Sequence, residues 1–343
     1  MSEVRPSLEE WRRLYEAAIR LKEIAPWQWM EETDVFGVQD PETQELGFVS
    51  IMGLLGQHLA LGLYLGAEGL YRFWGMQAEP GEMASLESML AVRELQVSFE
   101  DRDMLDPEDR AVIKELGLTF RGRQAWPLFR SYRPGYFPWF LEPAEARFLT
   151  HAIEQAIDVV LRYRDNPDLL QQPGEYDYLV RVPHQEGTAL VWEDRIVTVP
   201  PVEPELVAVP MDMLALETAK KLPRMSQALE VDFFVMPIRI GTKSERPRYP
   251  YMLLLVESAL GLVCGHQFFE VQTSVEATWA LVPLSLVRGF LSMKMVPRRV
   301  RVMSPYLPIV LKPLSQELGF DIELTHELPA LQRAKDSLFE RFA

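Results

Sequence analysis

The chain has 343 residues, enough for two domains of ordinary size, and its 48% hydrophobic and 25% charged residues are the balance of a globular protein. The net charge is −15, of which residues 1–172 carry −12, and this argues against the basic stripe of a nucleic-acid reader without excluding a local basic patch. One cysteine excludes an intramolecular disulfide, and no signal-peptide or membrane-spanning pattern is present, so we expect a cytoplasmic protein.

The first half begins with a predicted helix. Ser7 and Glu10 form a capping-box pattern, and apolar residues recur at helical spacing as far as Ile24. The later elements follow from alternation, caps and turn residues. In chain order they are two strands around a turn at 40–45, a strand at 58–66, helices from 67 and at 83–93, a strand at 95–101, a helix capped by Asp106, a strand at 118–122 and a long helix at 142–164.

The polar, helix-breaking stretch after this long helix predicts a domain boundary. We place an N-terminal α/β domain at 1–172 and a C-terminal α/β domain at 173–343. Residues 173–230 are expected to form a β-hairpin and a proline-rich connector, which either belong to the second domain or bridge both. Residues 231–343 are predicted to be a core of order βββαβαβα, with one helix at 274–293.

Three meandering strands followed by strands joined through helices are the order of the ribonuclease-H-like fold. The first half, from Val35 to Gly122, gives nearly the same order, with the strand at 95–101 in fourth place. We therefore expect two α/β domains, each with a mixed sheet of ββαβαβ-like order, and an internal duplication at the level of fold.

A family resemblance agrees with two domains. The segments "FGVQDPETQELGFVSIMGLLGQHLALGLYLGAEGL" and "FRGRQAWPLFRSYRPGYFPWFL" resemble an uncharacterised bacterial family defined as a domain of unknown function. The C-terminal half is similar to a second such domain that often follows the first. This resemblance implies a bacterial, cytoplasmic, two-domain protein and assigns no catalytic residue.

Carboxylate positions test for metal-dependent catalysis. An active nuclease of this fold needs carboxylates in the middle of its first strand and at the end of its fourth. In the second half these positions hold residues 234–236 and Met303 with Ser304, while Asp232 stands only at the strand start, so we expect this domain to be catalytically silent.

The first half has carboxylates closer to the strand positions that a metal site requires. Asp40 closes its first strand, and Glu100, Asp101 and Asp103 cluster at the end of the strand at 95–101, after Phe99. A metal-dependent hydrolase or nuclease would bring these carboxylates together. The favoured interpretation is a turn at Asp40 and a solvated strand end, and no cofactor or metal motif is found elsewhere.

Two further segments are candidate binding surfaces. Residues 125–141 contain seven aromatic residues and two arginines, and they form either a ligand surface or, as we favour, a proline-stiffened strap whose rings are mostly buried. A basic segment near 300 either binds phosphate or an acidic partner or, as we favour, is the solvent-facing side of a strand. The candidate binding residues are Trp126, Arg130, Arg133, Tyr136 and Trp139 in the first segment, and Arg298, Arg299 and Arg301 in the second.

The sequence therefore favours a non-enzymatic binding or scaffold protein, with the metal-dependent hydrolase as the alternative. The expected partner is a protein or a small molecule, and a homodimer is compatible with the acidic first half and the basic segment of the second. Nucleic acid and membrane are not expected partners.

Overall fold

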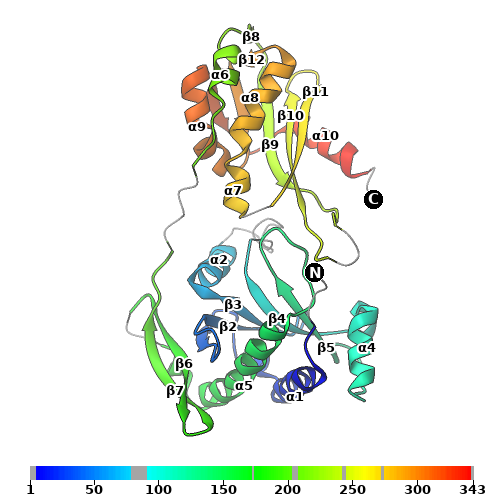
Figure 1. Ribbon diagram of the computed structural model, residues 1–343, viewed down its shortest axis with the longest axis vertical. Helices are drawn as coiled ribbons and strands as arrows, with labels where there is room; N and C mark the ends of the chain where they lie inside the picture. The colour runs from blue at the N-terminus through cyan, green and yellow to red at the C-terminus, as the bar shows by residue number, and fades with distance from the viewer. Residues whose placement is uncertain are drawn as a thin grey trace. The chain divides into compact units, whose positions relative to one another are not determined.

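The computed structural model describes residues 5–78, 91–171, 174–202, 208–241, 245–271 and 274–340. The chain folds into two compact units (Figure 1). The first contains residues 1–134 and 138–203, and the second contains residues 135–137 and 204–343.

The first unit is built on a seven-stranded sheet of order β5-β4-β3-β2-β1-β6-β7. All neighbouring strands are antiparallel except β1 and β6, which are parallel. The three strands and the hairpin expected from the sequence are confirmed. The strands are β1 (Phe36–Gln39), β2 (Leu46–Met52), β3 (Ala60–Leu65), β4 (Glu94–Glu100), β5 (Trp126–Tyr132), β6 (Asp177–Glu186) and β7 (Ala189–Thr198).

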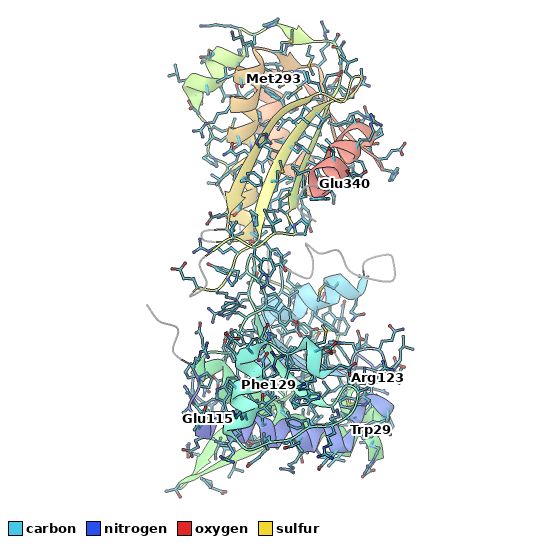
Figure 2. The ribbon with its side chains drawn as sticks, turned by 90° about the vertical axis from the view of Figure 1, so that its right-hand side faces the viewer. Trp29, Glu115, Arg123, Phe129, Met293 and Glu340 are labelled. Atoms are coloured by element: carbon cyan, nitrogen blue, oxygen red, sulfur yellow. The ribbon has the colours of Figure 1, made fainter. Side chains whose placement is uncertain are left out.

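Helices cover both faces of this sheet. Helices α1 and α5 lie side by side on one face and enclose the main core with the sheet, and Phe129 of β5 belongs to it (Figures 1 and 2). Helix α2 covers part of the other face, over Phe48 and Tyr64. The helices of the unit include α1 (Leu8–Ile24), α2 (Gly66–Ala78), α4 (Pro107–Glu115) and α5 (Pro143–Asp165), with 3₁₀ turns η1 (Pro26–Gln28), η2 (Arg102–Met104) and η3 (Pro167–Leu170).

The second unit has a five-stranded sheet of order β11-β10-β9-β13-β14. Strands β9, β10 and β11 form an antiparallel meander, while β13 runs parallel to β9, and β14 runs parallel to β13. A small parallel pair joins β8 and β12. The strands are β8 (Arg224–Met225), β9 (Leu229–Val235), β10 (Pro250–Glu257), β11 (Val263–Glu270), β12 (Val296–Pro297), β13 (Arg299–Val302) and β14 (Asp321–Leu324).

Alternation along β10 separates the two faces of the five-stranded sheet. Met252 and Leu254 pack with α10, whereas Leu255 points to Gly289 of α8 on the opposite face. The residues expected to form one helix at 274–293 form α7 and α8 instead, with Pro283 near the start of α8. The helices are α6 (Met213–Ala219), α7 (Val275–Trp279), α8 (Val282–Met293), α9 (Tyr306–Leu318) and α10 (Pro329–Phe339).

The structure differs from the expected organisation at the domain boundary. The division falls at 203/204 rather than at 172/173, because β6 pairs with β1 and its hairpin partner β7 extends the first sheet. A sequence shows that a hairpin forms but does not show which sheet receives it, since parallel pairing joins distant segments.

The expected duplication is also corrected. Both sheets share a three-stranded meander with a parallel strand beside its first strand, but in the first unit that strand is β6. The strand predicted for this place, β4, pairs with β3 at the other side, and residues 118–122 form no strand. The strand order beyond these four strands therefore differs between the units. The helix expected at 83–93 lies largely outside the described residues.

Candidate functional site

The start of α1 is fixed by local hydrogen bonds. The Ser7 backbone N–H donates to Glu10 Oε2 at 2.7 Å, and the Glu10 N–H donates to Ser7 Oγ at 3.3 Å, which is the capping box expected from the sequence. One carboxylate oxygen of Glu10 is thereby held against the helix end. The other oxygen is directed towards α5.

Helix α5 supplies the facing side chains. Thr150 and His151 lie three and four residues after Arg147, so both share a face of the helix with it. Thr150 is buried, and its hydroxyl group donates to the Ala146 carbonyl. Since α1 packs along α5, these side chains stand opposite the first two turns of α1.

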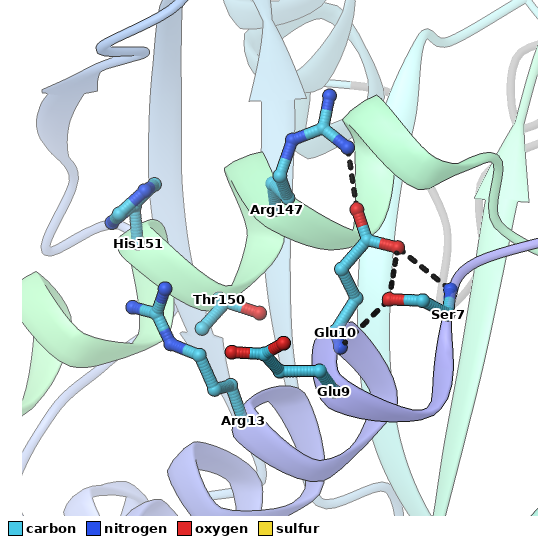
Figure 3. A pocket seen from close by; sticks show the side chains of 7 residues that line it. All are labelled: Ser7, Glu9, Glu10, Arg13, Arg147, Thr150 and His151. Atoms are coloured by element: carbon cyan, nitrogen blue, oxygen red, sulfur yellow. Dashed lines mark hydrogen bonds and ion pairs between the residues drawn. The ribbon is translucent and has the colours of Figure 1, made fainter.

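A polar pocket lies between these helices. Figure 3 shows that it is lined by side chains of both helices, and its volume is about 280 Å³. This is small compared with pockets for drug-sized ligands. The lining residues are Ser7, Glu9, Glu10, Arg13, Arg147, Thr150 and His151.

One wall of the pocket is formed by Arg147, whose guanidinium group lies between two carboxylates. It binds Glu10 through Nη1 and Glu42 through Nε and Nη2, with an Nη2 to Glu42 Oε2 distance of 2.8 Å. These contacts raise the pKa of Arg147, and its hydrogen bond lowers the pKa of Glu42. Burial opposes ionisation of Glu10, but the Ser7 N–H and Arg147 together hold its pKa below the ordinary value. The wall is therefore charged and fixed before any ligand binds.

The opposite wall carries a looser group of charges. Arg13 lies 3.4 Å from Glu154, and its side chain is 54% exposed. His151 Nδ1 lies 3.7 Å from the same carboxylate, and the proximity of His151 lowers the pKa of Glu154. Nδ1 is buried, and no hydrogen bond to it is found within the described part of the chain. Trp192 stands beside the imidazole ring, with the ring centroids 5.8 Å apart.

The structure does not bring the predicted first-half carboxylates together. Asp40 bonds with Glu45 beside the end of β3, whereas Glu100 ends β4 next to the start of β3. Asp40 accepts from the Thr43 hydroxyl at 2.6 Å, which is the turn that the sequence favoured. Asp101 accepts from the Gln124 N–H at 2.7 Å, and Asp103 is exposed. Among the described residues, no group of three metal-ligating side chains is found.

The arginines of the aromatic segment are held by acidic neighbours. Arg130 binds Asp106 and Asp109, each at 2.8 Å, and Arg133 binds Glu142 and Glu145 at 2.7 and 2.9 Å. Residues Trp126–Tyr132 form β5, and the backbone of Trp139 pairs with that of Ser131. The segment is therefore partly a sheet strand.

The expectation that most of its rings are buried is wrong. Phe129 is 3% exposed, and the other six rings of the segment are partly exposed, at Trp126, Tyr132, Tyr136, Phe137, Trp139 and Phe140. Within the second unit, Tyr136 pairs with Arg248, and Phe137 stacks on Tyr249 with centroids 3.5 Å apart. These rings are thus in contact with protein groups without being enclosed.

Two of the three arginines in the basic segment of the second unit, Arg299 and Arg301, also pair with carboxylates. Val300 and Val302 are buried as expected, but only Arg299 fits the predicted solvent-facing side, at 59% exposure and 3.4 Å from Glu323. Arg301 reaches the fully buried Glu230 at 3.3 Å, and its side chain is 24% exposed. The side chain of Arg298 is exposed.

The carboxylates of β9 require a correction. Asp232 stands in the middle of this strand rather than at its start, and it is buried. Lys335 of α10 binds it, and Glu230, two residues earlier on the same face, accepts from Arg301 and from the Leu331 N–H at 2.8 Å. An ammonium and a guanidinium group thus neutralise these carboxylates internally.

The sequence pattern located Ser7 and Glu10 as a helix cap but did not indicate a pocket. The helical spacing of Arg147, Thr150 and His151 places them on one face of α5. This spacing would have indicated a pocket only if the packing of α5 against α1 were known. Close packing of helices distant in sequence cannot be inferred from either helix alone.

Comparison with known families matches each unit separately. Residues 11–181 match a domain of unknown function (DUF7309), and residues 215–339 match a second domain of unknown function (DUF6930). The chain carries both domains in tandem. The DUF7309 match covers α1 from Trp11, the sheet as far as Arg181 of β6, and all pocket-lining residues from Arg13 onward, while the DUF6930 match covers the five-stranded sheet. No curated protein matches the chain significantly.

In the described residues, no helix has both the length and the apolar character needed to cross a bilayer.

Proposed function

We propose that this protein is a non-enzymatic binding protein whose DUF7309 domain holds a small polar molecule in the pocket between α1 and α5. The observation that carries the proposal is the fixed wall formed by Arg147 between Glu10 and Glu42. A charged wall that is ordered before binding lowers the entropic cost of holding a ligand. The pocket volume of about 280 Å³ suits a molecule smaller than a typical drug.

The hydrolase alternative gains no support from the described geometry. Asp40 and Glu100 stand at opposite ends of β3, and the buried carboxylates of β9 already have cationic partners in Lys335 and Arg301. A divalent metal at β9 would have to displace these internal cations. A binding role requires no such rearrangement.

Three broader features belong to the same proposal. The strand order of the DUF6930 domain supports a ribonuclease-H-like fold, since its meander is followed by the parallel strand β13 beside β9 and by β14 beside β13. The resemblance of the sequence favours a bacterial source. The single cysteine, whose pKa is raised by burial, agrees with a cytoplasmic structural thiol rather than a nucleophile.

The binding function is tested with the full chain and a defined library of small polar metabolites, screened by ligand-observed NMR. We expect bound compounds to lose their signal changes in Glu9→Trp, because a bulky ring on this exposed position fills the pocket mouth. Glu16→Trp is the matched control, since it lies two helical turns further along α1 and is also exposed. A library without binders, or binders that Glu9→Trp leaves unaffected, would refute the proposal.

A further inference from the structure

The charges of the pocket are of both signs, and they are not equally available. Arg147 and Glu10 are bound to each other, and Arg147 also binds Glu42. The remaining charged lining groups are Glu9 and Arg13, four residues apart on the same face of α1, and the imidazole of His151 lines the pocket beside them. These three groups define what a ligand meets.

Arg13 and His151 offer donors on one side of the pocket. Within the described residues Arg13 makes one ion pair, at 3.4 Å with Glu154, and its side chain is 54% exposed, so much of its planar guanidinium group remains accessible. Such a fork fits a carboxylate group. In Figure 3 the guanidinium of Arg13 and the ring of His151 lie near each other.

Glu9 offers an acceptor nearby. Its side chain is exposed and lines the same pocket, and Figure 3 shows its carboxylate between Arg13 and Glu10. An isolated anion would meet Arg13 but also the negative charges of Glu9 and Glu154, and an isolated cation would meet Glu9 but also Arg13. A ligand with both charges satisfies both groups.

We infer that the ligand is a small zwitterion of the class of a free α-amino acid, with its carboxylate at Arg13 and His151 and its ammonium group at Glu9. This inference rests on the proposed binding function. The buried Thr150 forms the floor between the two charged sides, and the volume of about 280 Å³ matches a molecule of this size. Recognition would thus depend on two charges held a short distance apart.

The test compares three probes at equal ionic strength: glycine, which carries both charged groups, acetate, which carries only the carboxylate, and methylammonium, which carries only the ammonium group. Binding to the full chain is followed by the signals of selectively labelled histidine, with the His151 signal identified by its loss in His151→Gln. The chain has five histidines, so the spectrum is simple. We expect glycine to bind at least ten times more tightly than acetate or methylammonium.

Variants separate the two charged contacts. Glu9→Gln should reduce glycine binding about tenfold, to that of acetate, and Arg13→Gln should reduce it about tenfold, to that of methylammonium, since a tenfold change corresponds to about 1.4 kcal/mol. Glu16→Gln and Arg20→Gln are the matched controls, because each lies seven residues further along α1 and is exposed. These controls should leave glycine binding within twofold of the wild type.

The outcomes distinguish this inference from the proposed function. Acetate or methylammonium binding as tightly as glycine would overturn the zwitterion while leaving the pocket as a ligand site. The same holds if glycine binds but neither Glu9→Gln nor Arg13→Gln weakens it. If none of the probes shifts the His151 signal, the zwitterion is excluded, and the metabolite screen with Glu9→Trp decides the binding function by itself.

Discussion

The two sheets differ in the partners that they provide for a buried acidic side chain. In the five-stranded sheet, Glu230 is fully buried and lies 3.3 Å from the guanidinium of Arg301. In the seven-stranded sheet, Glu94 is 7% exposed, and the side chain that bonds its carboxyl group is the neutral amide of Gln96, at 3.0 Å. Glu230 is therefore neutralised by a cation. Burial raises the pKa of Glu94 to about 8, and the hydrogen bond from Gln96 acts in the opposite direction.

This difference predicts that the two domains respond differently to pH. An ion pair keeps a buried carboxylate charged, and its loss leaves an uncompensated charge in the core. A carboxyl group with a raised pKa is stable in its neutral form and becomes costly once it ionises. The DUF7309 domain should therefore lose stability as pH rises, because Glu94 ionises without a cationic partner. In the DUF6930 domain, the corresponding buried carboxylate, Glu230, is already paired with Arg301.

The largest effect is expected from breaking the pair in the DUF6930 domain. Arg301→Met removes the cation from Glu230 and should lower the free energy of unfolding by roughly 3 to 5 kcal/mol at pH 7. Hydrogen exchange of the β9 and β10 amides in the full chain measures the change in this domain.

Arg299→Met is the control for this prediction. Arg299 lies two residues earlier on the same face of β13, but its ion pair with Glu323 is exposed, so its loss should cost less than about 1 kcal/mol. Equal destabilisation by both variants would show that the buried pair with Glu230 is not the source of the effect.

The second prediction concerns Glu94→Gln. The pKa of Glu94 is raised in the folded protein, so the stability of its neutral form is fully present below the unfolded value of 4.5 and is lost as pH rises through about 8. The wild type should lose about 3 kcal/mol of stability in the DUF7309 domain between pH 5 and pH 8, and Glu94→Gln should not. Hydrogen exchange of the β3 and β4 amides at both pH values measures this.

Glu68→Gln serves as the control for Glu94, because Glu68 is exposed on α2 of the same domain. It should keep the pH dependence of the wild type. A Glu94→Gln variant with unchanged pH dependence would contradict the assignment of this effect to Glu94.

The smallest effect is expected from Gly62→Ala. A Cβ atom at Gly62 would lie 2.7 Å from Glu94 Oε1 and 3.2 Å from the Met52 methyl group, so the carboxyl group must shift. We expect a destabilisation of about 1 kcal/mol. Unfolding of Gly62→Ala combined with Glu94→Ala checks this, because removing the carboxyl group should abolish most of the added cost; a cost that remains in the double variant would place the clash elsewhere.

Local signals in the sequence predicted most individual elements correctly. The capping box at Ser7 and the N-cap at Asp106 marked the starts of α1 and α4, and alternating apolar residues marked β1, β2 and β3. These signals depend on residues a few positions apart, which is why they can be recognised without the fold. The predictions failed where an element needed a distant partner, as for β5 and the segment at 118–122.

The sequence by itself determined the balance of two α/β domains, the acidic first half, the helix caps and the strand order of residues 231–343. Only the tertiary structure decided that β6 and β7 complete the first sheet, that Arg301 reaches Glu230, and that α1 and α5 enclose a charged pocket. The physical reason is the separation along the chain over which each interaction acts. Caps and alternation act between near neighbours in the chain, whereas sheet pairing, ion pairs and pockets join residues that only the packed fold brings together.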